Sequence, residues 1–319
     1  MPDLAAPLKL GADCFGQNTT WSEYLTAMQL ADRLGYDSLW TPDHVLPTSG
    51  DLTGPILEPY MSLAAVAAST SQATLGLLVS PVSLRHPTLM AKMVTTLDHI
   101  SEGRAILGVG AGWAASEHLQ YGLDFGASQG ERLRWLEEAL PVLRGMLDGE
   151  RPSSNGPRYD VQEAINEPRP VQRHLPLLVG GGGPTVTPRL VATFADANNL
   201  IGDPAFVAER DAALVAHCED LGRDEREIER TVALRWPIVR DSRAEAERVR
   251  RAMMEHQGLD PSLLAELAGT PEDLFELTAA YAEIGYRHII AGLLAPYDEE
   301  TMTRIIAEVR PRLEVMLTT

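Results

Sequence analysis

The chain alternates between short runs of consecutive apolar residues and longer stretches in which apolar residues recur every three or four positions. The short runs have the length of buried strands, and the longer stretches have the period of amphipathic helices. Glycine, proline or asparagine usually separates one segment from the next. The short runs predict eight strands, at residues 8–15, 37–41, 73–80, 104–110, 175–180, 197–202, 230–239 and 287–294.

A helix is predicted between successive strands, and two helix starts carry clear capping signals. Thr20-Trp21-Ser22-Glu23 has the form of a capping box, and Thr270-Pro271-Glu272-Asp273 combines a cap with proline and acids in the first turn. Further helices are predicted at 59–70, from Pro87, at 131–147, between 180 and 197, and around Met302 to Val309. Eight strands that alternate with helices predict a single (β/α)8 barrel of the TIM type over residues 1–319.

Two segments exceed the usual length of a loop and are predicted to be insertions. Residues 151–174 are rich in proline, arginine and asparagine, whereas residues 241–268 are polar, charged and predicted to be helical. The second segment follows the seventh strand, which places it over the carboxyl-terminal mouth of the barrel. It is either a lid or a solvated helical decoration.

Net charge, cysteine content and histidine spacing limit which partners and metal ions the protein is expected to bind. The net charge of −18 argues against nucleic acids and anionic membranes, and no apolar run of about 18 residues predicts a membrane span. Cys14 and Cys218 belong to no CxxC or Cys/His group, so we expect reduced thiols and no structural zinc. The eight histidines lack HxH and HExxH spacing, which disfavours a metal-dependent hydrolase. We expect a cytoplasmic protein without a targeting segment, which binds a small-molecule substrate.

The end of the second strand carries the first candidate chemistry. Pro42 cannot donate to a sheet ladder and is expected to end the strand, so that Asp43 and His44 emerge at the barrel mouth. His44 could act as a general acid or base, or as a hydrogen-bond donor to a substrate. The alternative is a structural histidine that is tied to a backbone carbonyl.

Two glycine clusters lie at the ends of the fourth and fifth strands: GVGAGW at residues 108–113 and GGGG at residues 180–183. Glycines at strand ends let a ligand approach the backbone and let successive amides turn toward an anion. The first cluster is not a dinucleotide fingerprint, because Trp113 stands where the GxGxxG pattern needs its last glycine. Together the clusters favour a cofactor that bears phosphate; tight turns are the alternative.

With these motifs in place, the sequence resembles the luciferase-like monooxygenase superfamily, and within it the oxidoreductases that use the deazaflavin coenzyme F420. The resemblance covers nearly the whole chain in colinear order, and the same fold binds FMN in the same place. The stretches that carry it are residues 34–47, 75–104, 106–122, 166–183, 189–202 and 269–274.

The resemblance implies a role for each motif. The histidine that matches His44 takes the hydroxyl proton of the substrate in sugar and alcohol dehydrogenases of the family. A non-proline cis peptide bond is implied in the segment Leu78-Val79-Ser80, behind the reactive ring. The cofactor contacts that the resemblance implies are Asp43, Leu78, Val79, Ser80, Gly110, Ala111, Gly112, Trp113, Gly181, Gly182 and Gly183.

We therefore expect an F420-dependent oxidoreductase that oxidises an alcohol or reduces an activated double bond, and that forms a homodimer. The sugar-phosphate dehydrogenases of the family have glutamate where this chain has Trp113 and tryptophan where it has Thr48, so a sugar phosphate is not the expected substrate. Two alternatives stay open: a monooxygenase that uses reduced FMN, and a carrier or sensor that binds the cofactor without turnover.

For three further groups of residues, the sequence leaves open whether they contribute to the site or only to the structure. Glu117 and His118 are expected to be an exposed pair on the loop after the fourth strand. Arg85 and His86 follow the third strand and could contact the cofactor or the substrate. Trp40 could wall the pocket or belong to the barrel core.

Overall fold

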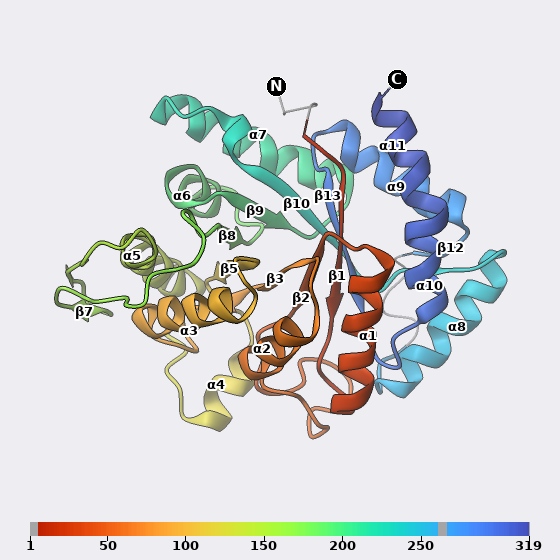
Figure 1. Ribbon diagram of the computed structural model, residues 1–319, viewed down its shortest axis with the longest axis horizontal. Coiled ribbons are helices and arrows are strands. Elements are labelled where there is room, and N and C mark those ends of the chain that lie inside the picture. The colour runs from red at the N-terminus through yellow and green to blue at the C-terminus, as the bar shows by residue number, and fades with distance from the viewer. Residues whose placement is uncertain (1–5, 261–266, 319) are drawn as a thin grey trace.

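The computed structural model describes residues 6–260 and 267–318, and its parallel strands form one closed barrel surrounded by helices (Figure 1). The strands at the barrel wall are β1 (Lys9–Cys14), β2 (Ser38–Thr41), β3 (Thr74–Leu77), β4 (Ser80–Pro81), β5 (Ala105–Gly110), β8 (Leu177–Gly180), β9 (Ala197–Leu200), β10 (Glu229–Leu234) and β13 (His288–Leu293). Their order is β3, β2, β1, β13, β10, β9, β8, β5 and β4, and β3 also pairs with β5 to close the ring. Each predicted strand is present, and the predicted (β/α)8 barrel is confirmed.

Helices cover the outside of this barrel. They are α1 (Trp21–Leu34), α2 (Pro59–Ser69), α3 (Pro87–Ile100), α4 (Ala115–Tyr121), α5 (Gln129–Leu147), α6 (Val186–Phe194), α7 (Pro204–Leu221), α8 (Arg243–His256), α9 (Pro271–Glu283), α10 (Glu299–Arg304) and α11 (Arg310–Thr318), with a 3₁₀ turn η1 (Glu225–Glu227) and a π-helical turn η2 (Ile305–Val309). Thr20 forms the predicted capping box, and the predicted cap Thr270 forms a capping box with Asp273 as well. Helix α4 was not predicted; its first residue is preceded by Ala114, which offers no side-chain cap.

Two strands deviate from their predicted course near the mouth. The third strand is interrupted by a cis peptide bond between Leu78 and Val79, as expected, and resumes as β4. The seventh predicted strand ends at Leu234, because Trp236 has a positive φ of 50° and Pro237 has no amide hydrogen. The chain then forms β11 (Ile238–Val239), which pairs with β12 (Ala268–Gly269) outside the barrel.

Apolar side chains fill the barrel as well as the space between barrel and helices. The interior cluster consists of Trp40, Leu178, Ala197, Ala233 and Ile290. Trp40 is fully buried there, so this side chain is core rather than a pocket wall.

A chain of hydrogen bonds closes the amino-terminal end of the barrel. The Trp40 indole donates to Oγ of Ser38 at 2.7 Å, and that oxygen lies 2.7 Å from Nε2 of His288. Nδ1 of His288 lies 2.7 Å from Glu229, whose carboxylate also accepts from Lys9 at 2.9 Å. We call Lys9, Ser38, Trp40, Glu229 and His288 the barrel floor.

The first predicted insertion runs along the outside of the barrel, where the Tyr159 hydroxyl donates a hydrogen bond to the Val82 carbonyl just after β4. Residues 151–174 precede β8 and contain a small hairpin of β6 (Ser154–Asn155) and β7 (Asp160–Val161). In the second insertion, α8 packs against residues that follow barrel strands, among them Trp236 and Leu294. This agrees with its predicted place at the mouth, although residues 261–266 of that insertion lie outside the described residues.

None of the helices within the described parts of the chain is long and apolar enough to cross a membrane. Cys14 and Cys218 are both buried and form no disulfide.

Candidate active site

Asp43 lies two residues after β2 and is buried against the side chain of Arg85. One carboxylate oxygen accepts a hydrogen bond from Nη1 of Arg85, whose Nη2 donates to Glu58 at 2.6 Å. The other oxygen, Oδ1, is buried and has no hydrogen-bond partner among the described residues. Burial raises the pKa of Asp43, and Arg85 only partly opposes that effect. A ligand that donated a hydrogen bond to Oδ1 would complete the bonding of this carboxylate.

His44 is held by a carboxylate from another part of the barrel. Its Nδ1 lies 3.0 Å from Oε1 of Glu117, which belongs to α4 after β5. The second oxygen of Glu117 accepts a hydrogen bond from the Val45 amide at 2.9 Å. Within the described residues, Nε2 of His44 makes no hydrogen bond, and it is not among the buried unpaired atoms. The imidazole is therefore anchored at one nitrogen and open at the other.

The expectation that Glu117 and His118 form an exposed pair is wrong. Glu117 is 1% exposed and His118 is fully buried, because both lie on the inner face of α4. His118 contacts the carbonyl of Ala114 and the hydroxyl of Ser83, each at 2.8 Å. The loop after β5 thus contributes a short helix that carries two ionisable side chains toward the mouth.

Trp113 stands beside His44 at the edge of the site. The two rings meet edge to face, with centroids 5.3 Å apart, and 66% of Trp113 is exposed. Gly112, just before it, adopts a φ of +83°, and its carbonyl accepts a hydrogen bond from Arg132 at 3.1 Å. The tryptophan therefore offers a large apolar surface next to the open imidazole.

Several glycines of the first cluster and one of the second make room for Val79. A methyl group added at Gly110 would lie 2.8 Å from one methyl group of Val79. A methyl group added at Gly180 would lie 3.0 Å from each of the two Val79 methyl groups. At Gly108 it would lie 2.1 Å from the carbonyl of Leu77. These glycines let the Leu78-Val79 turn fill the space between β5 and β8, so their first effect is on packing within the protein.

The second glycine cluster leads into the amino terminus of α6. Among the described residues, the amides of Gly182 and Gly183 donate no hydrogen bond, and the capping residue Thr185 provides no side-chain acceptor. Nε of Arg210 donates to the Gly182 carbonyl at 3.0 Å and so holds this loop against α7. Free amides at a helix amino terminus form a binding site for anions such as phosphate.

Asp13 is a candidate that the sequence reasoning missed. Asp13 lies two residues after Gly11 on β1, so the two residues face the same side of the strand. A methyl group added at Gly11 would meet Ser38, Ile290 and Trp40, which places that side inside the barrel. Asp13 is 5% exposed, and its Oδ1 has no hydrogen-bond partner among the described residues. Burial raises its pKa well above the usual value. The signal was available in the sequence, since Asp13 is an acid that follows the uncharged run Leu10-Gly11-Ala12 within a strand.

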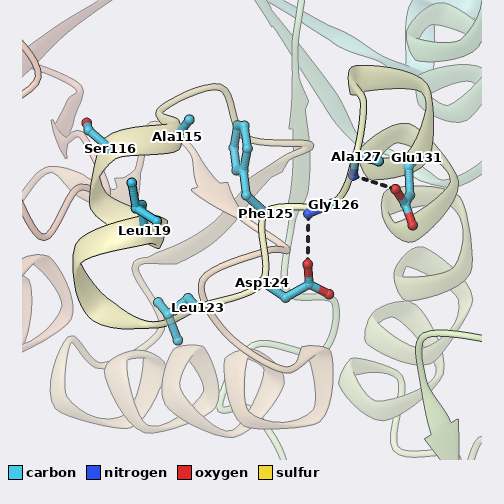
Figure 2. A pocket seen from close by; sticks show the side chains of 9 residues that line it. All are labelled: Ala115, Ser116, Leu119, Leu123, Asp124, Phe125, Gly126, Ala127 and Glu131. Carbon is cyan, nitrogen blue, oxygen red and sulfur yellow. Dashed lines mark hydrogen bonds between the residues drawn. The ribbon is translucent and has the colours of Figure 1, made fainter.

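An open hollow of about 720 Å³ lies on the outer face of α4, away from the pair His44 and Glu117. Figure 2 shows that its two carboxylates are already engaged, Asp124 with the amide of Gly126 and Glu131 with that of Ala127. We assign no chemistry to it. Among the described residues there is also no group of three or more acidic, histidine or cysteine side chains placed to bind a metal ion.

Residues 6–266 match the model of one protein family, described as luciferase-like monooxygenase. An uncharacterised protein of Mycobacterium tuberculosis is 32% identical over 185 residues, which are 53% of this chain and 64% of the relative. The chain thus spans less than two thirds of the length of that relative. An F420-dependent glucose-6-phosphate dehydrogenase of Microbacterium testaceum is 26% identical over 97% of this chain and 98% of its own length.

Solved structures with the same fold bind different cofactors. An F420-dependent secondary alcohol dehydrogenase in complex with an F420-acetone adduct superimposes with a TM-score of 0.82 at 18% identity, covering 97% of this chain and 99% of its own. The FMN complex of a type II Baeyer-Villiger monooxygenase from Pseudomonas putida gives a TM-score of 0.73 at 18% identity, covering 96% and 99%. At such identities the likeness concerns the fold.

Proposed function

Because the chain belongs to the luciferase-like monooxygenase family, we propose that it is an oxidoreductase that uses coenzyme F420 on a small organic substrate. The observation that carries the proposal is the arrangement of His44, whose Nδ1 is anchored and whose Nε2 is open at the carboxyl-terminal mouth of the barrel. Such an imidazole can exchange one proton with a substrate, which is what a hydride-transfer enzyme needs from its protein. The similarity to an F420-dependent relative over 97% of the chain supports this choice of cofactor.

The residues present fit a cofactor of this kind. The free amides of Gly182 and Gly183, with the amino terminus of α6, would hold a phosphate in the cofactor tail. The unpaired Oδ1 atoms of Asp13 and Asp43 could each accept a hydrogen bond from a polar group of a ligand. When bound, a deazaflavin accepts or supplies the hydride at its central ring. The protein would then have to bind, orient and exchange one proton.

We propose an alcohol, or the carbonyl compound formed from it, as the substrate class. In the direction of oxidation, Nε2 of His44 would take the hydroxyl proton, the hydride of the same carbon would pass to the bound cofactor, and the C–O bond would become C=O. Trp113 stands where the sugar-phosphate dehydrogenases have an acid, and its exposed ring favours an apolar group on the substrate. A sugar phosphate therefore remains an unexpected substrate.

The cofactor assignment is tested by competition between F420 and FMN for the purified protein. We expect F420 to bind more tightly, by about tenfold or more, which corresponds to about 1.4 kcal/mol. Fluorescence titration of each cofactor alone, and then displacement of one by the other, measures this ratio. FMN binding that equals or exceeds F420 binding would overturn the assignment. It would favour the second candidate, a monooxygenase that uses reduced FMN, which the FMN-bound neighbour with the same fold supports.

A further inference from the structure

Glu117 commits both of its carboxylate oxygens to the segment that carries His44. Oε1 lies 3.0 Å from Nδ1 of the imidazole, and Oε2 accepts the Val45 amide at 2.9 Å. The two partners come from the loops after β5 and β2, and only 2% of the Glu117 side chain is exposed. A buried carboxylate that reaches across the mouth to one side chain and its neighbouring amide fixes both the loop and the ring.

The charge state of Glu117 decides where the imidazole carries its proton. Burial acts to raise the pKa of Glu117, but the hydrogen bonds from His44 and Val45 and the charge of His44 outweigh it, so its pKa is lowered. Near neutral pH the carboxylate is ionised and can only accept hydrogen bonds. Nδ1 of a neutral imidazole must therefore be the protonated nitrogen, and Nε2 keeps the lone pair.

The surroundings of the ring leave this role to Glu117. Asp43, next in sequence, points its carboxylate at Arg85, and His118 contacts Ala114 and Ser83. Trp113 meets the imidazole through its ring and carries no charge. Among the described residues, Glu117 is the charged group within ion-pair distance of the His44 nitrogens.

We propose that Glu117 is the positioning residue of His44: it holds the proton on Nδ1, fixes the ring orientation, and leaves Nε2 as the atom that exchanges a proton with the substrate. The catalytic use of that atom rests on the proposed function. The tautomer of His44 is independent of the proposed function, because Glu117 sets it in the absence of cofactor and substrate. A carboxylate behind the imidazole also stabilises the positive charge that forms when Nε2 takes a proton.

The first test measures the tautomer in the wild-type protein by ¹⁵N NMR of labelled histidine, with His44→Ala to assign the signal. Above the pH at which the ring loses its charge, we expect Nδ1 to be protonated and Nε2 to be bare. A neutral ring protonated at Nε2 would overturn the proposal. This measurement needs no variant of Glu117, so it decides the matter even if such a variant fails to fold.

The second test replaces the carboxylate by its amide in Glu117→Gln. The amide oxygen can still accept from Val45, but its NH₂ group donates to Nδ1 and favours the proton on Nε2. We expect the NMR signal to change to that tautomer and kcat to fall by about 10²-fold or more, while the Kd of the cofactor stays within about threefold. Glu131→Gln is the matched control, because Glu131 on α5 likewise accepts a backbone amide, that of Ala127, and the variant is expected to keep the wild-type kcat.

The two measurements separate the possible failures. An unchanged tautomer and a kcat within about twofold of wild type in Glu117→Gln would show that Glu117 only anchors the Val45 loop, and the proposal would be wrong. Failure of F420 to bind, with the predicted tautomer present, would instead overturn the proposed function and leave the role of Glu117 intact.

Discussion

At the scale of single residues, His44 is the side chain whose loss should separate chemistry from binding. His44→Ala removes the open Nε2 but leaves the glycine loop and α6 in place. We expect turnover to fall by roughly 10²–10⁴, the usual effect of losing a positioned acid or base. The Kd of F420 should change only a few-fold. Steady-state kinetics on an alcohol panel and a cofactor titration give the two numbers.

Two results would contradict this prediction. Full turnover of His44→Ala would mean that the proton comes from another group or from water. Loss of the folded state would show that the anchor to Glu117 is structural, since the variant leaves that carboxylate buried without its imidazole partner. Thermal unfolding of the variant distinguishes the second case.

The position of His44 could be predicted from its neighbours, but its partner could not. Pro42 marks the strand end, and in a barrel that places Asp43 and His44 at the mouth. Glu117 lies 73 positions further along, and the helix that turns it inward begins without a side-chain cap that the sequence could reveal. The sequence predicts that the glycines approach a ligand, and the structure adds that Gly108, Gly110 and Gly180 also accommodate Leu77 and Val79.

At the scale of secondary structure elements, apolar runs predicted the strands well, because buried parallel strands need continuous apolar sequence. The predictions erred where chain direction changes. The seventh strand was expected to reach residue 239, yet Trp236 turns the chain out and β11 leaves the barrel wall. At that turn the Trp236 ring packs edge to face against Phe15, with ring centroids 6.1 Å apart, which is a contact between distant segments.

Strand β1 carries an acid whose burial should cost stability. The alternation of β1 turns Asp13 into the barrel, where burial raises its pKa well above the usual value. The unfolded chain releases this proton near pH 4 and the folded chain only at higher pH, so the stability of the wild type falls as pH rises between those values. Asp13→Asn removes this loss. We expect the variant to be more stable at pH 7 by about 1 kcal/mol or more, and similar to the wild type at pH 4.

Urea unfolding at both pH values measures this difference. Asp32→Asn is a control of opposite sign. The Asp32 carboxylate accepts hydrogen bonds from the amides of Ser71, Gln72 and Ala73, so this variant should be less stable than the wild type. A stability difference between Asp13→Asn and the wild type that does not change from pH 4 to pH 7 would rule out a raised pKa for Asp13.

At the scale of the whole molecule, the two ends of the barrel differ in how their polar groups are bonded. Counting only residues 6–260 and 267–318, the mouth has carboxylate oxygens and amides without hydrogen-bond partners, whereas the barrel floor joins its polar groups in a continuous chain. That chain connects β2, β13, β10 and β1 around the closed sheet. Satisfied polar groups at the floor and unsatisfied ones at the mouth indicate that stability and ligand binding can be altered independently.

Glu229 is the residue that tests this separation. Burial acts to raise its pKa, but His288 and Lys9 outweigh it and lower the pKa from 4.5 to about 2. A carboxylate with a depressed pKa in the folded state stabilises the protein above pH 4.5, and that contribution is lost as the pH falls toward 2. Because 38% of the side chain is exposed, solvent screening reduces the effect, and we expect Glu229→Gln to lose about 1–2 kcal/mol at pH 7. At pH 3 the difference from the wild type should shrink.

Urea unfolding at pH 7 and pH 3 measures both stability differences. Glu167→Gln is the control, since Glu167 is 65% exposed and its loss should change the free energy of unfolding by less than about 0.5 kcal/mol. The Kd of the cofactor should stay at the wild-type value in Glu229→Gln, and a large change in that Kd would mean that floor and mouth are coupled through the barrel core.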